Sequence, residues 1–314
     1  MGRDPDELDR ALDAVHAKLR SVEDLIFGSP AVFAGVPVAC PEDRALLRQV
    51  THARALICPM CLREYRSAGS VWDLRPFLDA LDEAEDAVHM GRGEPTWRRF
   101  LDKAIRVREF ERRALPEFVG VKTFLELGGG LSYAAALVKL GSPNTVVVAT
   151  DVSPRYLAQH AVPLADFLEA PVDVWVAADV RRLPFADGQF DRVWSAMLIY
   201  RLPDPSEAIR EIRRVLAPGG RWIGLEPVAP WGWPWSAWEA RRMAALNQRR
   251  GTQETPRPMR FWRRLAASEN LRLRAPPGSR VRWPWARVLV NAVRGVHVWL
   301  EFGEMPEETF PLTG

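Results

Sequence analysis

An apolar run that ends in three consecutive glycines constrains this chain more than any other feature. Residues 124–132 read Phe-Leu-Glu-Leu-Gly-Gly-Gly-Leu-Ser, and residues 133–141, rich in alanine and leucine, follow them. This pattern predicts a buried strand, a turn and a helix. Glycine lets the backbone bend with positive φ and approach a ligand closely, and the start of the helix offers free N–H groups. We therefore expect a ligand site at this turn.

The same pattern continues along the second half of the chain. From residue 121 onward, apolar runs of strand length alternate with helical segments, which indicates βαβ units and a mostly parallel sheet. The expected strands are 123–127, 145–150, 172–177, 190–195 and 221–225, and the alternating residues 296–302 could close the sheet. The strands end at Gly, Asp or Ser, where open α/β sheets bind ligands. The fold class is therefore predicted to be α/β.

The spacing of the glycines separates two nucleotide-binding families. A dinucleotide fingerprint needs Gly-x-Gly-x-x-Gly, and the position of its third glycine is Tyr133. Glu126, Gly128 and Gly130 instead resemble motif I of the class I S-adenosylmethionine-dependent methyltransferases, with Ser132 in place of the last glycine. Further segments resemble that family in the same order, namely Asp151, Asp179, 183–193, 202–205 and 216–220. The resemblance covers residues 121–228.

This resemblance implies a Rossmann-like fold with a mostly parallel seven-stranded sheet and S-adenosylmethionine as cofactor. It implies that Asp151 accepts hydrogen bonds from both ribose hydroxyls, and that Asp179 and the next N–H read the adenine edge. It places the methyl acceptor beyond the ends of the fourth and fifth strands. The residues expected to bind the cofactor are Glu126, Gly128, Gly129, Gly130, Ser132, Asp151, Val152, Asp179, Val180, Ser195 and Ala196.

Methyl transfer from an activated donor needs chiefly alignment, and it needs a general base only where the acceptor must lose a proton. Tyr200 and Glu226 lie at the ends of predicted strands and are the catalytic candidates, although packing or capping roles suit them as well. No cysteine lies in residues 121–314, which excludes a covalent cysteine mechanism. The Asn/Asp-Pro-Pro-Tyr motif of exocyclic amine methylation is also missing after the fourth strand, where the sequence reads Ser195-Ala-Met-Leu.

The three cysteines lie in the first fifth of the chain and predict a metal site. Cys58 and Cys61 have the spacing of a zinc knuckle, and Cys40 and Asp43 offer a thiolate and a carboxylate, with His52 as an alternative ligand. Residues 36–76, expected to contain few strands, resemble the zinc ribbon that precedes the catalytic domain of large-subunit rRNA guanine methyltransferases. The alternative is a degenerate ribbon that has lost its metal.

These features divide the chain into four parts. We expect an amphipathic N-terminal helix in 1–35, a zinc-ribbon-like module in 36–76, a helical linker in 77–120 and a methyltransferase domain in 121–314. The last part contains an insertion rich in Trp and Arg after the fifth strand, beginning at Trp231. That insertion could cover an apolar acceptor, contact nucleic acid or a lipid-like substrate, or only pack.

Charge and hydropathy limit the partners. The net charge of +3 does not by itself indicate nucleic acid, and every apolar run is shorter than the roughly 20 residues that cross a bilayer. We predict a cytoplasmic enzyme, without integral membrane association, that methylates a small, apolar or aromatic molecule. The alternatives are an rRNA or tRNA base methyltransferase, which would make RNA the partner, and a non-catalytic S-adenosylmethionine-binding scaffold. The amphipathic N-terminal helix could pack on its own chain or pair with a second copy in a homodimer.

Overall fold

The structure is a computed structural model that describes residues 28–50, 54–76, 115–229, 241, 257–274 and 296–303. Several predicted features lie outside these residues. They are the N-terminal helix, the helical linker up to residue 114, the tryptophans of 231–238 and the candidate ligand His52.

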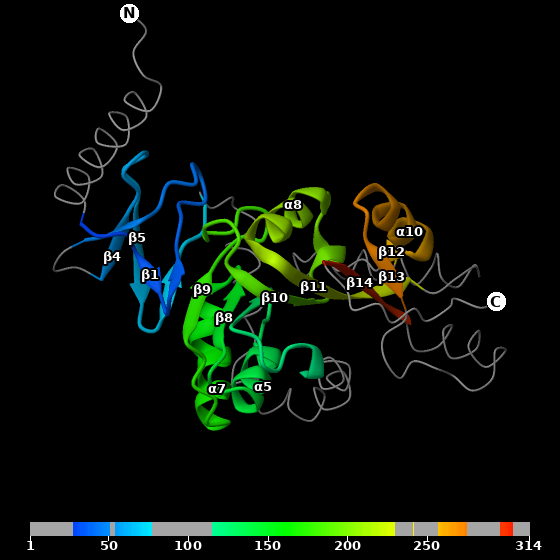
Figure 1. Cartoon of the computed structure of the whole chain (residues 1–314), viewed down its shortest axis with the longest axis horizontal. Coiled ribbons are helices and arrows are strands. Elements are labelled where there is room, and N and C mark those ends of the chain that lie inside the picture. Colours follow the sequence, from blue (N-terminus) through cyan, green and yellow to red (C-terminus); the bar gives the residue numbers. More distant parts are fainter. Residues whose placement is uncertain are drawn as a thin grey trace, which may run out of the picture.

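One sheet dominates the described part of the chain, and its strands come from both halves of the sequence (Figure 1). Its order is β13-β14-β11-β10-β7-β8-β9-β6-β5-β4-β3, with β12 paired to β11, and β1 and β2 form a separate pair. The strands are β1 (Val32–Phe33), β2 (Val36–Pro37), β3 (Arg48–Gln49), β4 (Ala55–Ile57), β5 (Glu64–Ala68), β6 (Val71–Asp73), β7 (Thr123–Leu127), β8 (Val146–Asp151), β9 (Val174–Ala177), β10 (Phe190–Ala196), β11 (Leu216–Ala229), β12 (Arg257–Pro258), β13 (Arg272–Arg274) and β14 (Val296–Gly303).

The predicted Rossmann-like core is confirmed. β9, β8, β7, β10 and β11 pair in parallel, and β14 and then β13 close that side in antiparallel fashion. All five predicted parallel strands form, and the first four lie within two residues of their expected bounds. β11 is longer than predicted. It runs from Leu216 through two glycines to Ala229, whereas the predicted strand began after those glycines.

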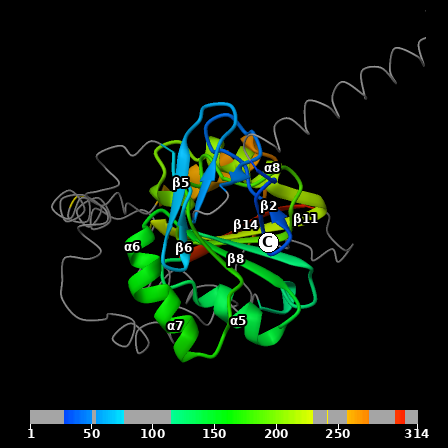
Figure 2. The same ribbon diagram turned by 90° about the vertical axis from the view of Figure 1, so that its left-hand side faces the viewer.

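Helices cover both faces of the sheet, and the strands serve two cores (Figure 2). Leu125 and Val148 pack with α8 (Ser206–Val215) and α10 (Met259–Ser268) in one apolar cluster. Phe124 and Val147 pack with α5 (Tyr133–Gly141) and α7 (Val162–Phe167) in the other. Successive side chains of a strand point to opposite faces, so buried runs supply both cores. None of the described helices is long and apolar enough to span a membrane. The helices are η1 (Leu115–Glu117), α5 (Tyr133–Gly141), α6 (Pro154–Tyr156), η2 (Leu157–Ala161), α7 (Val162–Phe167), η3 (Ile199–Arg201), α8 (Ser206–Val215) and α10 (Met259–Ser268).

The cysteine-bearing region departs from the prediction. Residues 36–76 were expected to contain few strands, but β2 to β6 all lie there, so that prediction is wrong. Most of these strands have two or three residues, which is too short for a readable alternation of apolar and polar positions. β6 pairs in parallel with β9, so the region extends the main sheet. We call residues 28–76 the N-terminal module.

Candidate functional site

The glycine turn and a carboxylate of the neighbouring strand are joined by a hydrogen bond. The turn connects the end of β7 to the start of α5. Asp151, at the end of β8, accepts the N–H of Gly130 at 2.9 Å through Oδ2 and the N–H of Ser153 at 3.0 Å through Oδ1. The Asp151 side chain is half-buried, and each carboxylate oxygen has a second lone pair. Asp151 can therefore hold the turn and still accept hydrogen bonds from a ligand.

Gly128 and Gly130 both have positive φ, but the space around them differs. Gly128 has a φ of +58°, and a Cβ there would come within 2.7 Å of Leu198 Cδ1. Gly130 has a φ of +55°, but a Cβ there would meet nothing closer than Tyr156 Cε1 at 3.8 Å. The space beside Gly130, next to Asp151, is thus open. S-adenosylmethionine fits this arrangement, because a nucleoside can approach the bare backbone while its ribose faces a carboxylate.

Asp179 lies on the adjacent strand at the same edge and already has a partner. The N–H of Ala178 donates to the Asp151 carbonyl at 2.9 Å, which aligns the ends of β8 and β9. Arg181 Nε lies 3.0 Å from both carboxylate oxygens of Asp179, and Arg181 Nη2 lies 2.5 Å from Oδ2. The arginine side chain is 42% exposed. If Asp179 binds the adenine of a ligand, that adenine must share the carboxylate with this arginine or displace the arginine.

Two other candidates lie deeper than a ligand contact requires. Glu126 is 2% exposed, and its Oε2 accepts the N–H of Ala135 in the first turn of α5 at 2.9 Å. Ser195 is fully buried, and its hydroxyl accepts the indole N–H of Trp222 at 3.1 Å. Both side chains stabilise the ends of the strands through buried hydrogen bonds. Val152, Val180 and Ala196 directly follow Asp151, Asp179 and Ser195 at the ends of three strands.

The two catalytic candidates are joined through backbone atoms. Glu226, on β11, has no exposed surface, and its carboxylate accepts the N–H groups of Leu198, Ile199 and Tyr200 at 3.0–3.3 Å. Burial raises the pKa of Glu226 to about 7, against the effect of these three hydrogen bonds, which lower it. Tyr200 is 6% exposed, and the Arg201 guanidinium lies 5.7 Å from its ring centroid. Glu226 therefore fixes the backbone after β10.

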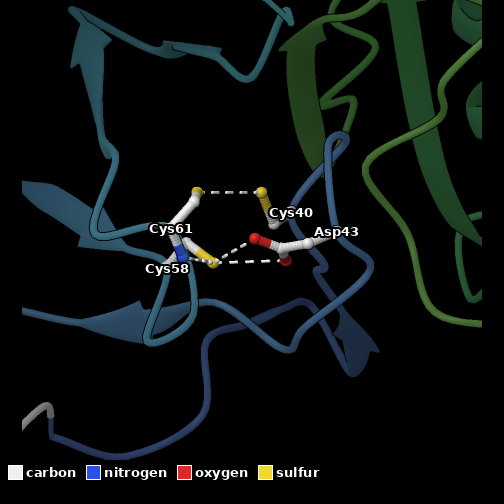
Figure 3. Close-up of side chains that lie close together, drawn as sticks. All are labelled: Cys40, Asp43, Cys58 and Cys61. Carbon is white, nitrogen blue, oxygen red and sulfur yellow. Dashed lines mark hydrogen bonds between the residues drawn. The ribbon is translucent and has the colours of Figure 1, made fainter.

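A second site lies in the N-terminal module, where the four predicted metal ligands converge (Figure 3). One ligand atom from each of Cys40, Asp43, Cys58 and Cys61 lies within 4.8 Å of the others. The Sγ atoms of Cys40 and Cys61 are 3.8 Å apart, and Cys58 Sγ lies 3.1 and 3.3 Å from the Asp43 oxygens. Zn–S bonds of about 2.3 Å give a tetrahedral S–S edge of about 3.8 Å. The four side chains could therefore hold a metal ion.

Hydrogen-bond donors surround the sulfurs of this cluster, but burial opposes their ionisation. The N–H groups of Met60 and Cys61 both lie 3.4 Å from Cys58 Sγ, and the Tyr65 hydroxyl lies 3.2 Å from Cys40 Sγ. Burial raises the pKa of the Cys58 and Cys61 thiols, and the adjacent Asp43 carboxylate raises it further. A divalent cation would reverse that effect by stabilising the thiolates, whose charge the N–H groups also favour.

The sequence did not predict two arginine contacts, one made by Arg181 beside Asp179 and one by Arg44 beside the cysteine cluster. Arg181 lies two residues after Asp179, and that spacing is a local signal for a turn closed by the aspartate. Arg44 forms a two-pronged ion pair with Glu211, which is 167 residues away in the sequence. Nothing in the order of residues indicates that second contact.

Comparison with known proteins finds methyltransferase relatives for the segment that contains the glycine turn. Residues 125–224 match the family model described as "Methyltransferase domain". A demethylmenaquinone methyltransferase of Thermus thermophilus is 38% identical over 113 residues, which are 35% of this chain and 50% of the relative. A malonyl-[acyl-carrier protein] O-methyltransferase of Dechloromonas aromatica is 35% identical over 106 residues, 34% of this chain and 36% of the relative. The chain thus spans half or less of the length of these curated relatives.

Among solved structures, a chain of the complex between the Haloferax volcanii Trm112 methyltransferase activator and a methyltransferase superposes with a TM-score of 0.48 at 20% identity. The superposition covers 72% of this chain and 98% of that chain. The family match over residues 125–224 coincides with the parallel strands, the glycine turn and the two aspartates described above. This part of the chain is a class I S-adenosylmethionine-dependent methyltransferase domain.

Proposed function

We propose that the chain transfers a methyl group from S-adenosylmethionine to a small, apolar or aromatic acceptor. One observation carries the proposal. The glycine turn, Asp151 and Asp179 lie at the carboxyl ends of the neighbouring parallel strands β7, β8 and β9. Open α/β sheets bind nucleotide ligands at this edge, and the match to a methyltransferase domain supports S-adenosylmethionine as the ligand.

The residues of the edge divide the work of binding. When bound, the cofactor supplies a methyl group already activated by a positively charged sulfur. Asp151 accepts hydrogen bonds from the ribose hydroxyls, and Asp179 with the N–H of Val180 reads the adenine edge. Gly130 leaves room for the ligand beside the backbone. Alignment of the acceptor is then the main task of the rest of the domain.

Glu226 and Tyr200 take different parts in that alignment. The Glu226 carboxylate is fully buried and accepts three backbone N–H groups, which favours a positioning role over proton transfer with a substrate. It holds the segment 198–200 at the end of β10, where the family resemblance places the acceptor. Tyr200 remains the candidate for direct contact with the acceptor, and a tyrosine ring suits an aromatic or apolar surface.

Two further observations support a small acceptor. The matching relatives are named as methyltransferases of demethylmenaquinone and of a malonyl group on a carrier protein. Residues 121–314 contain no cysteine, so the covalent mechanism used for carbon-5 of pyrimidines has no nucleophile there.

Transfer of labelled methyl groups to fractionated cell extracts tests the proposal. We expect label in the small-molecule fraction, with the same yield after nuclease treatment. Label that disappears with nuclease would assign an RNA acceptor instead. A protein that binds S-adenosylhomocysteine but labels no fraction would indicate a scaffold.

We further propose that Cys40, Asp43, Cys58 and Cys61 hold one structural zinc ion, and that residues 36–76 are a zinc-ribbon-like module in front of a methyltransferase domain that spans 121–314. The separation of 3.8 Å between two sulfurs supports tetrahedral coordination. Elemental analysis of protein purified without chelators should find about one zinc ion per chain. Absence of metal, with thiols that react freely in the folded protein, would make the module a degenerate ribbon.

A further inference from the structure

The turn that carries two of the proposed metal ligands also holds the segment that follows Asp179. The N–H of Ala39 donates to the Pro184 carbonyl and the N–H of Ala186 donates to the Pro37 carbonyl, both at 3.1 Å. Val38 and Phe185 form an antiparallel bridge between these two contacts. Residues 37–39 thus run beside residues 184–186, immediately before Cys40.

Side chains from the same turn extend this contact toward Asp179. Arg44, the neighbour of Asp43, donates to both oxygens of Glu211 at 2.6 and 2.8 Å and to the Leu183 carbonyl at 3.3 Å. Glu211 in turn accepts the N–H of Leu183 at 2.9 Å. Both backbone polar groups of Leu183 are therefore fixed by a network that includes Arg44.

Only three residues separate Leu183 from the Asp179 backbone. The N–H of Arg182 donates to the Asp179 carbonyl at 3.0 Å, which closes residues 179–182 into a single turn. Arg182 Nη1 also lies 2.6 Å from Oε2 of Glu42, a residue between Cys40 and Asp43. A continuous series of contacts consequently runs from the cysteine cluster to the residue expected to read adenine.

We propose that residues 37–44 are a positioning element for the cofactor-binding segment 179–186, so that ion binding at the cysteine cluster and cofactor binding at Asp179 are energetically coupled. The inference rests on the proposed function, since it needs both ligands. An ion would fix Cys40 and Asp43, and with them the neighbouring Arg44. Arg44 then holds Leu183 and Glu211 in place. Asp179 consequently keeps the position that its ligand requires. Coupling of this kind is reciprocal, so each ligand raises the affinity for the other by the same factor.

The first test uses Arg44→Gln in the full-length protein. Glu211 keeps the Arg214 side chain and the Leu183 N–H as partners, so the variant leaves no buried charge unpaired. We expect the dissociation constant of S-adenosylhomocysteine in calorimetry to rise at least threefold. The matched control is Arg66→Gln, which breaks an exposed ion pair with Glu64 in the same module, away from the contact with residues 183–186, and should leave the affinity unchanged. Equal affinities for the wild type and Arg44→Gln would overturn the proposal.

The second test measures reciprocity and does not depend on activity. Removal of zinc by a chelator should weaken S-adenosylhomocysteine binding in the wild type, and added Zn²⁺ should restore it. Saturating S-adenosylhomocysteine should tighten Zn²⁺ binding by the same factor, and by less in Arg44→Gln. A wild type that binds both ligands independently, or that binds no Zn²⁺, overturns the coupling. Failure of the wild type to bind S-adenosylhomocysteine would overturn the proposed function itself, and this inference with it.

Discussion

The cysteine cluster and the cofactor edge are built in opposite ways. The strands of the N-terminal module have two to five residues, and its four candidate ligands stand on two turns. The cofactor edge, by which we mean the carboxyl ends of β7 to β11 with the glycine turn, stands on strands of four to fourteen residues whose side chains fill two cores. A short strand fixes little backbone by itself, whereas a long buried strand fixes the turn at its end. We therefore expect the cluster to depend on its ligand and the edge to be preformed.

The two regions nevertheless share apolar packing. Cys40 and Leu56 of the module belong to the same buried cluster as Val176, Leu183 and Phe185 of the methyltransferase domain. The N-terminal module, residues 28–76, is so short that a core of its own would be marginal for independent stability. The module uses the domain as the other half of its core, and an ion would supply the remaining stabilisation.

Loss of the proposed zinc ion should produce the largest effect that separates the two regions. Cys58 is fully buried, and Cys58→Ser removes a ligand that the cluster cannot replace. Because structural zinc contributes about 10–16 kcal/mol of binding free energy in isolated zinc-finger peptides, we expect a loss of several kcal/mol of unfolding free energy and of the bound zinc. Thermal unfolding and elemental analysis measure both.

Met60→Ala is the matched control for this prediction, since Met60 lies in the same knuckle and is 72% exposed. It should retain the metal and the unfolding temperature. Cys58→Ser with wild-type stability would show that the module, like the cofactor edge, is held by packing alone.

Asp151→Ala tests the preformed edge and should have the next largest effect. Each charge-assisted hydrogen bond that we propose between Asp151 and the ribose would contribute about 1.5–3 kcal/mol, so the affinity for S-adenosylhomocysteine should fall at least tenfold. Asp166→Ala removes an exposed carboxylate from α7 and should change nothing. A folded Asp151→Ala protein with unchanged affinity in calorimetry would contradict the assignment of this residue.

The same contrast explains what the sequence could predict. The strand of 123–127, the glycine turn and the helix that follows are contiguous, so their local pattern defined them before any tertiary contact was known. The parallel order of the sheet followed from the alternation of strands and helices. The convergence of the four candidate ligands was also predicted, because Cys58 and Cys61 share one knuckle and Cys40 and Asp43 share one turn.

Features made by distant residues were not predictable. The pairing of β6 with β9 joins segments about 100 residues apart, and three residues of β6 carry no signal for that partner. The catalytic interpretation of Glu226 rested on its position at a strand end, which does not reveal that three N–H groups from residues 198–200 surround its carboxylate. Such a network depends on how β10 and β11 pack, and spacing along the chain does not encode it.

Glu226→Gln should produce a smaller effect that depends on pH. The pKa of Glu226 is raised from 4.5 to about 7 in the folded protein, chiefly by burial. Stability that the wild type gains by protonating this group is present below pH 4.5 and is lost as the pH rises through about 7. The stability of the wild type relative to the variant should therefore fall by at least about 1 kcal/mol between pH 4.5 and pH 7.5.

Urea unfolding of both proteins across this range measures the change. Glu207→Gln, which replaces an exposed glutamate on α8, is the control and should show no such dependence. A wild type that becomes more stable relative to Glu226→Gln as the pH rises would show that the three N–H groups outweigh burial.

The smallest expected effect concerns Ser132, which occupies the last glycine position of the turn. Its φ of +50° lies in the left-handed region, and its buried Oγ has no hydrogen-bond partner among the described residues. Ser132→Gly should therefore stabilise the protein by about 0.5 kcal/mol, since the relief of strain exceeds the entropy that glycine gains on unfolding. Glu169→Gly relieves a similar φ of +53° at an exposed side chain, so the difference between the two variants isolates the buried hydroxyl. Affinity for S-adenosylhomocysteine should stay within twofold, because Ser132 has no exposed surface. A larger loss of affinity would mean that the hydroxyl contacts the cofactor. This part of the edge would then rearrange on binding, contrary to our expectation that the edge is preformed and that only the cysteine cluster depends on its ligand.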